Sequence, residues 1–266
     1  MPRVSVIVPV RNGSATIESA IHSLIWQTYQ DMKIYIVNDR STDNTYELCE
    51  RMAGTSDKIL LVDNPGQGIS SALNYAVELS DSTYIARMDA DDISFPERLK
   101  RQTELLDNSP DLAVVGSAFI RFGALNKFAF VPTDEASCYY CSRLFSPFCH
   151  PTTVFRRSAL EEIGGGYDGN YNGAEDFELF SRMLDSFKGA NIADPLFAYR
   201  IHPSQVSATQ SEQQRRLSRT IIKRNVDKVV ASMGRAKAYR TILQNIPRSM
   251  MPNALRSFRA LLMVSG

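Results

Sequence analysis

Residues 4–38 decide the fold class, and their sequence is VSVIVPVRNGSATIESAIHSLIWQTYQDMKIYIVN. The apolar run at 4–8 predicts a buried strand, and residues 33–38 predict a second one. Between them, apolar residues recur at helical spacing over 17–27, which predicts a helix. A strand, a helix and another strand in this order favour a right-handed crossover between parallel neighbours.

The same alternation continues to about residue 92. Further strands are expected at 59–62 and 84–88, with helices at 43–52 and 70–79. This pattern predicts an α/β fold with a mainly parallel central sheet flanked by helices. Ligands bind such sheets outside the carboxyl ends of the strands. That rule favours four loops as a binding site, namely residues 9–12, 39–41, 64–68 and 89–92.

The second half of the chain has weaker patterns. Ser94 followed by Glu97, with a proline in the first turn, predicts a helix start, and this helix should run to about Asn108. Two strands and one helix are then expected, at 113–120, 152–155 and 174–186. No internal repeat is apparent.

Composition and charge narrow the class of protein. Apolar residues make up 44% and charged residues 22% of the 266 residues, which is typical of a globular protein. No apolar run approaches the roughly 18 residues that span a bilayer. No basic segment followed by an apolar segment opens the chain, so we expect a cytoplasmic protein.

The net charge of +1 conceals a basic tail on an acidic body. Residues 1–202 hold 18 Lys and Arg against 27 Asp and Glu, a balance of −9, whereas residues 203–266 hold 12 against 2, a balance of +10. This asymmetry favours an anionic surface as partner, and the scarcity of interleaved aromatic residues makes nucleic acid the weaker choice.

Two apolar stripes in the tail have helical spacing. The first contains Ile222, Val226, Val229, Val230 and Met233, and the second contains Met251, Leu255, Phe258 and Leu262. Such stripes either pack on the body of the protein or form a peripheral membrane helix. The basic charge favours the membrane.

The four cysteines allow a metal-site hypothesis that the spacing does not favour. Two residues separate Cys138 from Cys141, and Cys149 precedes His150. This spacing matches no zinc pattern, so we expect free thiols, and for His150 we expect a structural role.

The strongest local signal is the acidic run that follows the predicted strand at 84–88. Asp89, Asp91 and Asp92 place three carboxylates within four residues, and these repel one another unless a cation neutralises them. Oxygen ligands of this kind suit Mg²⁺ or Mn²⁺. The alternative is a solvated acidic turn at a helix N-terminus.

Three other polar segments strengthen the hypothesis of a site. Asp39 follows the second predicted strand, where a carboxylate could accept a hydrogen bond from a nucleobase, although it could also cap the next helix. Gly68 closes a loop whose glycines allow a ligand close to the backbone. Glu175 and Asp176 open a predicted helix and suit a general base, although acids also favour helix N-termini in general.

Together these segments resemble the family 2 glycosyltransferases, which are inverting enzymes of the GT-A fold. The resemblance covers residues 4 to about 207, with the motifs in family order. The segments that carry it are VSVIVPVRN at 4–12, VNDRSTD at 37–43, DADD at 89–92, AED at 174–176 and YRIH at 199–202. Arg11, Asn38 and Arg40 depart from the family pattern.

The resemblance implies roles for particular residues. Nucleotide contacts are expected from Pro9, Val10, Arg11, Asp39, Gly68 and Asp89. Mn²⁺ or Mg²⁺ is expected at Asp91, with Asp89 and His202 assisting. Asp176 would be the catalytic base, with Glu175 beside it.

The resemblance also implies an organisation and a reaction. Residues 1–205 would form a GT-A catalytic domain, with a nucleotide-binding half at 1–112 and an acceptor-binding half at 113–205, followed by a basic amphipathic helical tail at 206–266. The enzyme would move a hexose-type sugar from a nucleotide-diphosphate donor to a glycan or lipid-linked acceptor, in bacterial surface polysaccharide biosynthesis at the inner face of the plasma membrane. UDP is the favoured nucleotide; dTDP and GDP stay open.

Two other functions are alternatives to this transferase. A sugar nucleotidyltransferase has a related sheet, but it needs a glycine-rich basic loop after the first strand, and Arg11-Asn12-Gly13 is a poor version. A sugar-binding module or scaffold without turnover would not need both Asp91 and Asp176. The sequence therefore favours the transferase.

Overall fold

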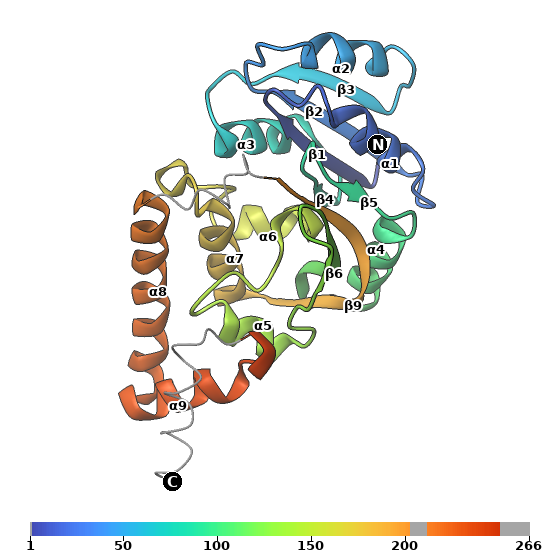
Figure 1. Ribbon diagram of the computed structural model, residues 1–266. Helices are drawn as coiled ribbons and strands as arrows, with labels where there is room; N and C mark the ends of the chain where they lie inside the picture. Colours follow the sequence, from blue (N-terminus) through green and yellow to red (C-terminus); the bar gives the residue numbers. More distant parts are fainter. Residues whose placement is uncertain (1, 203–211, 251–266) are drawn as a thin grey trace.

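The structure is a computed structural model that describes residues 2–202 and 212–250 (Figure 1). Its first part alternates strands and helices as expected. The elements are β1 (Val4–Val10), α1 (Ile17–Ile25), β2 (Met32–Asn38), α2 (Thr45–Ala53), β3 (Ile59–Asp63), α3 (Ile69–Leu79) and β4 (Tyr84–Arg87). All four strands pair in parallel, with β1 between β2 and β4 and with β3 outside β2.

The second part of the chain extends the same sheet. Its elements are β5 (Ile93–Ser94), α4 (Arg98–Asn108), β6 (Leu112–Gly123), β7 (Lys127–Ala129), α5 (Glu135–Cys141), β8 (Val154–Arg156), α6 (Arg157–Glu162), α7 (Glu175–Ser186) and β9 (Lys188–Ile201). The sheet has the order β3-β2-β1-β4-β8-β6-β9-β5, and β7 pairs with β6.

The two halves of the sheet differ in direction. The short strand β8 lies between β4 and β6 and runs antiparallel to both, whereas β6 and β9 are parallel. The parallel pattern expected from the sequence therefore describes β1 to β4, and the other half is mixed.

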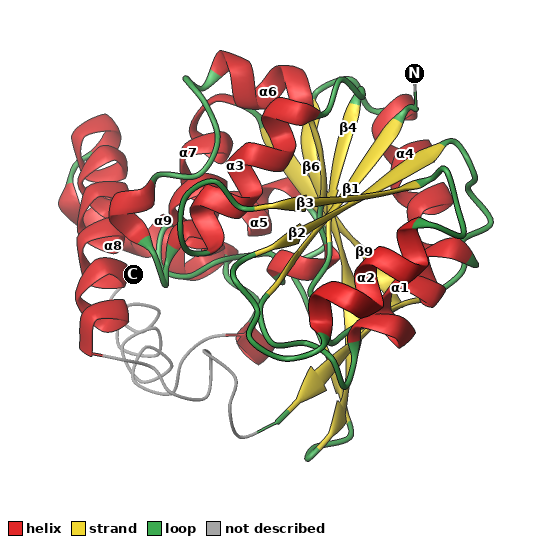
Figure 2. Cartoon of the chain, turned by 90° about the horizontal axis from the view of Figure 1, so that it is seen from above, coloured by secondary structure: helices red, strands yellow, loops and turns green. Residues whose placement is uncertain are grey.

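Helices cover both faces of the sheet (Figure 2). Helices α1, α2 and α4 lie on one face, and α3, α6 and α7 lie on the other. Each face has its own buried apolar cluster, because alternate residues of a strand point to opposite faces. In β1, for example, Val6 belongs to one cluster and Ile7 to the other.

The predicted helix start at Ser94 is wrong. Ser94 lies in β5 and pairs with Phe197 of β9, and its hydroxyl accepts a hydrogen bond from Gln27 Nε2 at 3.1 Å. Helix α4 begins at Arg98, after a Glu97 whose side chain makes no capping hydrogen bond. Tertiary pairing outweighs the local capping preference here.

The basic tail begins with two helices that pack on the rest of the protein. Helices α8 (Glu212–Met233) and α9 (Arg235–Asn245) contact each other, and they lie against α7 and α5 respectively (Figure 1). Ion pairs fasten α8 to α7: Arg224 Nη1 lies 3.0 Å from Glu178 Oε1, and Lys228 pairs with Asp185.

The first apolar stripe of the tail packs on the rest of the protein. The expectation that it forms a peripheral membrane helix is therefore wrong for this stripe. Its Val226 and Val229 are buried with Ile242 and Leu243 of α9 and with Cys141 of α5. The second stripe, at 251–262, lies outside the described residues. Within the described part of the chain, none of the helices is both long enough and apolar enough to span a bilayer.

Candidate active site

A cleft of about 840 Å³ opens at the carboxyl edge of the parallel strands. The ends of β1, β4 and β9, the start of α7 and the segment 148–151 form its walls. Most of the residues predicted for the site line this one cleft, namely Pro9, Val10, Arg11, Asp89, Asp91, Glu175, Asp176 and His202. Asp39 and Gly68 are not among the lining residues.

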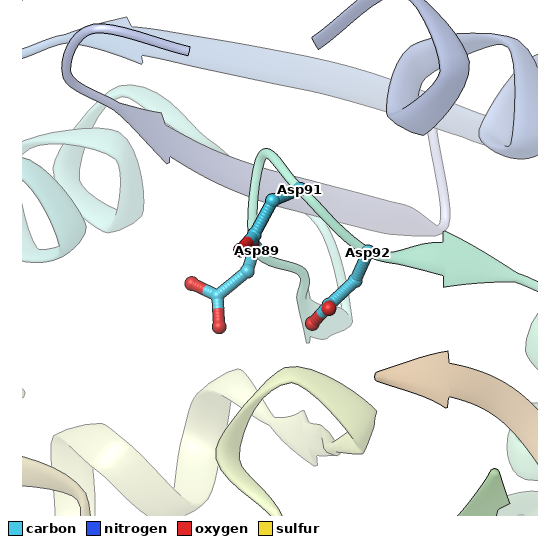
Figure 3. A group of neighbouring side chains, drawn as sticks. All are labelled: Asp89, Asp91 and Asp92. Atoms are coloured by element: carbon cyan, nitrogen blue, oxygen red, sulfur yellow. The ribbon is translucent and has the colours of Figure 1, made fainter. Parts of the chain in front are cut away.

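The acidic turn connects β4 to β5 (Figure 3). Asp89, Asp91 and Asp92 each bring one carboxylate oxygen within 4.8 Å of the others. Asp89 is paired with Arg87, a cation that is only 2% exposed. Burial and the charge of Asp91 raise the pKa of Asp89, although Arg87 opposes that rise.

The end of β9 braces this turn from the other side. The backbone N–H of Arg200 donates to Asp92 Oδ1 at 2.8 Å, and Arg200 Nε donates to the carbonyl oxygen of Asp91 at 2.7 Å. His202 Nε2 lies 3.0 Å from Asp91 Oδ2. Residues 108 to 111 positions apart in the chain thus meet at one turn.

The donor set of the turn suits a hard divalent cation. Asp92 Oδ2 is buried and has no hydrogen-bond partner among the described residues. Burial raises the pKa of Asp92 well above its ordinary value, and the charges of Asp89 and Asp91 raise it further. A cation bound by carboxylate oxygens would offset this repulsion, and Mg²⁺ and Mn²⁺ prefer such ligands.

The second acidic pair opens α7. Asp176 is half-buried at the cleft wall, and burial, followed by the charge of Glu175, raises its pKa to about 6. Glu175 is more buried, and its Oε2 accepts a hydrogen bond from the backbone N–H of Gly173 at 2.5 Å. Gly173 has a φ of +96°, a conformation that glycine adopts readily. Glu175 therefore braces the turn that presents Asp176 to the cleft.

Asp39 and Gly68 contact each other beside the cleft. The Asp39 carboxylate accepts from the backbone N–H of Gly68 at 3.0 Å and from Asn64 Nδ2 at 2.8 Å. Both of its oxygens thus hold the loop between β3 and α3, and the neighbouring Ile69 lines the cleft. Contact of Asp39 with a nucleobase stays a prediction.

Gln214 and Arg87 are among the cleft residues that sequence reasoning missed. Gln214 comes from α8, a segment that the sequence analysis treated as a tail, and nothing in its neighbourhood signals a site. Arg87 could have been found, because a cation in an apolar strand next to three acids is an unusual placement.

His150 and the four cysteines are possible site residues in the sequence. His150 lines the cleft, and its Nε2 lies 2.8 Å from the hydroxyl of Tyr167; burial lowers its pKa well below the ordinary value, so it is neutral. All four cysteines are free. Across residues 2–202 and 212–250, the side chains grouped closely enough to hold a metal ion are Asp89, Asp91 and Asp92, and this group contains no cysteine.

Comparison with known proteins decides the family. Residues 5–164, which are 160 of the chain's 266 residues, match the family model "Glycosyl transferase family 2". The chain belongs to glycosyltransferase family 2. As a family 2 glycosyltransferase it is an enzyme, which confirms the class that the motifs predicted.

Curated relatives of this glycosyltransferase carry similar names. It is 31% identical over 206 residues to the putative glycosyltransferase EpsE of Bacillus subtilis, covering 75% of this chain and 73% of EpsE. It is 30% identical over 210 residues to the O-antigen biosynthesis glycosyltransferase WbnJ of Escherichia coli, covering 75% and 80%. The amylovoran biosynthesis glycosyltransferase AmsE of Erwinia amylovora is 26% identical over 209 residues, covering 76% and 78%.

Solved structures confirm the fold. S. aureus TarS 1–349 in complex with UDP-GlcNAc superposes with a TM-score of 0.70 over 92% of this chain and 82% of that chain, at 16% identity. The mannosyltransferase PcManGT from Pyrobaculum calidifontis, in complex with GDP-Man and Mn²⁺, gives 0.60 over 98% and 84%, at 17% identity. This family 2 glycosyltransferase therefore has the GT-A fold that its motifs predicted.

Proposed function

We propose that this enzyme transfers a hexose-type sugar from a nucleoside-diphosphate donor to a hydroxyl group of a glycan or lipid-linked acceptor, with inversion at the anomeric carbon. One observation carries the proposal. The turn at Asp89–Asp91 and the acid Asp176, 85 positions beyond Asp91, line the same cleft. A charge-neutralising site and a base facing one space are the requirements of a glycosyl displacement.

The relatives support a place in bacterial surface polysaccharide biosynthesis. WbnJ and AmsE carry O-antigen and amylovoran biosynthesis in their names, and the TarS complex holds UDP-GlcNAc. We therefore favour a UDP-sugar as the donor. The GDP-Man in the PcManGT complex makes GDP the first alternative to test.

The nucleotide half of the donor would occupy the end of the cleft formed by the loop after β1. Pro9, Val10 and Arg11 line this end, and Asp89 lies across from them at the end of β4. Asp39 and Gly68 would bound the base from the neighbouring loop, where the Asp39 carboxylate holds the Gly68 backbone. Arg11 adds a cation to a site that takes a diphosphate.

Mn²⁺ or Mg²⁺ would be held by Asp91, with Asp89 and His202 as its neighbours. When bound there, the cation neutralises the charge that develops on the departing diphosphate. Arg87 pairs with Asp89 and opposes the rise of its pKa, and Arg200 holds the turn in place through Asp92. These contacts fix the oxygen positions before the donor arrives.

Asp176 would be the general base. Its carboxylate takes the proton of the acceptor hydroxyl as that oxygen forms a bond to the anomeric carbon. The bond from the anomeric carbon to the diphosphate oxygen breaks, and its electron pair leaves with the nucleotide. Attack from the face opposite the leaving group inverts the configuration. Glu175 keeps Asp176 in place through Gly173.

The enzyme would work as a cytoplasmic protein at the inner membrane face, held by basic side chains rather than by an apolar helix face. Cations remain exposed on α8 and α9, namely Arg215, Arg216, Arg219, Lys223, Arg235, Lys237 and Arg240. Clustered Lys and Arg attract anionic lipids at low ionic strength.

Vesicle pelleting tests this attachment. The full chain should sediment with vesicles of phosphatidylglycerol and phosphatidylcholine, and salt should release it. Replacing Arg215, Arg216 and Arg219 by Gln should weaken sedimentation, whereas replacing the body residues Arg51, Lys58 and Arg101 should not. Equal binding to neutral and anionic vesicles would contradict the attachment.

The function itself is tested by nucleotide release from UDP-, GDP- and dTDP-sugars. With Mn²⁺ or Mg²⁺, one donor should release its nucleotide slowly by hydrolysis, and EDTA should stop the release. If no donor is hydrolysed and calorimetry detects no cation-dependent binding of UDP, GDP or dTDP, the result favours a scaffold without turnover.

A further inference from the structure

A second hollow adjoins the catalytic cleft, and the proposed function does not use it. It has a volume of about 520 Å³, and we name it the side groove. Its lining includes Phe119, Arg121, Phe130, Ser146, Phe148 and Tyr199. Phe148, Cys149 and Tyr199 line both the side groove and the cleft, so the two spaces share a wall.

We propose that the side groove binds the acceptor, and that this acceptor is an anionic glycan: a pyranose ring stacks on the aromatic side chains while an oxyanion close to it pairs with Arg121. The inference rests on the proposed function and adds the chemical class of the acceptor. The polar and aromatic side chains that would contact this acceptor belong to β6, to β9 and to the segments between them.

The aromatic lining argues for a sugar ring. One face of a pyranose carries axial C–H groups, which pack on aromatic faces, while its hydroxyls point outward to water or polar groups. Phe119 and Tyr199 make an edge-to-face pair at 5.8 Å, which fixes both rings. Phe130 is 72% exposed and is held at 4.7 Å by Phe128. A ligand that covers this ring removes apolar surface from water.

Arg121 argues for a negative charge on that sugar. It is the one charged side chain among the described residues that line the groove. Its guanidinium lies 5.8 Å from the ring centre of Phe119, and within the described chain it forms no ion pair. The residue paired with it on β7 is Lys127, which cannot neutralise it. A half-buried cation of this kind binds a carboxylate or phosphate strongly.

The position of the groove matches the direction of the reaction. The nucleotide end of the cleft is formed by the loop after β1, whereas the groove meets the cleft at Phe148 and Cys149. Asp176 lines the cleft together with Phe148 and Cys149, so the proposed base and the junction belong to the same space. An acceptor in the groove therefore reaches Asp176 from the side away from the nucleotide.

The oxyanion can come from two sources with the same chemistry. One is the carboxylate of a uronic acid within the glycan. The other is the phosphate that joins a glycan to a lipid carrier. Methyl β-glucuronide and glucose 1-phosphate represent these sources, and methyl β-glucoside is the neutral counterpart.

The test is saturation-transfer NMR of these three glycosides with the full chain, with UDP and diamagnetic Mg²⁺ present to occupy the cleft. We expect at least one anionic glycoside to bind more tightly than methyl β-glucoside. Arg121→Gln should weaken that glycoside by about tenfold, the scale of a lost charge-assisted hydrogen bond, and should leave the neutral glucoside unaffected. Phe130→Ala should weaken both.

Two matched variants are the controls. Lys127→Gln removes a cation that pairs with Arg121 across the strands but does not line the groove. Trp26→Ala removes an aromatic ring that is 73% exposed directly after the end of α1. Neither should change glycoside binding. Melting temperatures of all four variants establish that they are folded.

Three results would overturn the proposal: no saturation transfer from any glycoside, equal affinity for charged and neutral glycosides, or equal losses in Arg121→Gln and Lys127→Gln. Nucleotide release by the unmodified chain is measured in parallel. Normal release with failed glycoside binding rejects the side groove alone, whereas absent release together with no cation-dependent nucleotide binding rejects the transferase function.

Discussion

At the scale of single residues, neighbouring carboxyl groups have different properties because their surroundings differ. Asp176 and Glu175 are neighbours, yet Glu175 is tied to the Gly173 backbone while Asp176 faces the cleft. Asp176 is also poised to titrate close to neutral pH, because burial raises its pKa to about 6. A base of this strength accepts a proton more readily than an ordinary aspartate.

This pKa predicts the pH dependence of transfer. The base acts in its deprotonated form, so kcat should fall below pH 6, by about tenfold per unit, and should be constant above about pH 7. The rate is measured with donor, acceptor and Mn²⁺ at saturation. A rate that stays constant down to pH 4.5 would contradict the role of Asp176.

At the scale of elements, α8 belongs with the catalytic domain although its composition suggests a separate tail. Helix α7 carries Asp176 at its start, and α8 lies along it. Glu178 of α7, which is buried, accepts from both Arg182 and Arg224. Gln214 of α8 reaches the cleft. The first turns of α8 therefore help to shape the site.

Arg224→Gln tests this attachment of α8. The change removes the contacts of Arg224 with Glu178 and with Ser181 Oγ, at 3.0 and 2.8 Å. Because Arg182 still pairs with Glu178 and Arg224 is partly exposed, we expect a loss of about 1–2 kcal/mol in the free energy of unfolding. Urea denaturation measures it.

The matched control is Lys223→Gln. Lys223 precedes Arg224 on α8 but is exposed and lies 3.8 Å from Asp227 of its own helix. Such surface pairs contribute little, so its midpoint in urea should not move. If the two variants have the same midpoint, α8 does not depend on the contact with α7.

At the scale of the whole molecule, the sequence predicts the first half of the fold, where strands and helices alternate in a regular hydrophobic pattern. Strands β1 to β4 and the helices between them follow from hydrophobic periodicity, and the end of each strand marks the site edge. Clustered carboxylates mark the turn at Asp89, Asp91 and Asp92 in the sequence, whereas Glu175 and Asp176 stand out only through the resemblance to the family. The membership of family 2 follows from the order of these motifs.

What the sequence could not predict depends on contacts between distant segments. Ser94 joins a strand because β9 pairs with it, and no local signal records that partner. The stripe of α8 faces α5 and α9 rather than a membrane, since an amphipathic pattern does not specify what covers it. Asp39 lies beside the cleft because it binds the backbone of Gly68 across two loops.

The most direct test of the whole account compares Asp176→Asn with Asp91→Ala, and with Asp111→Asn as an exposed control. For each protein, calorimetry measures the Kd for the nucleotide with Mn²⁺, and a transfer assay measures kcat. Asp176→Asn should lower kcat by about 10²–10⁴-fold with an unchanged Kd, whereas Asp91→Ala should weaken nucleotide binding and Asp111→Asn should change neither. A loss of nucleotide affinity in Asp176→Asn equal to that in Asp91→Ala, or full transfer by Asp176→Asn, would contradict the assignment of base and cation site.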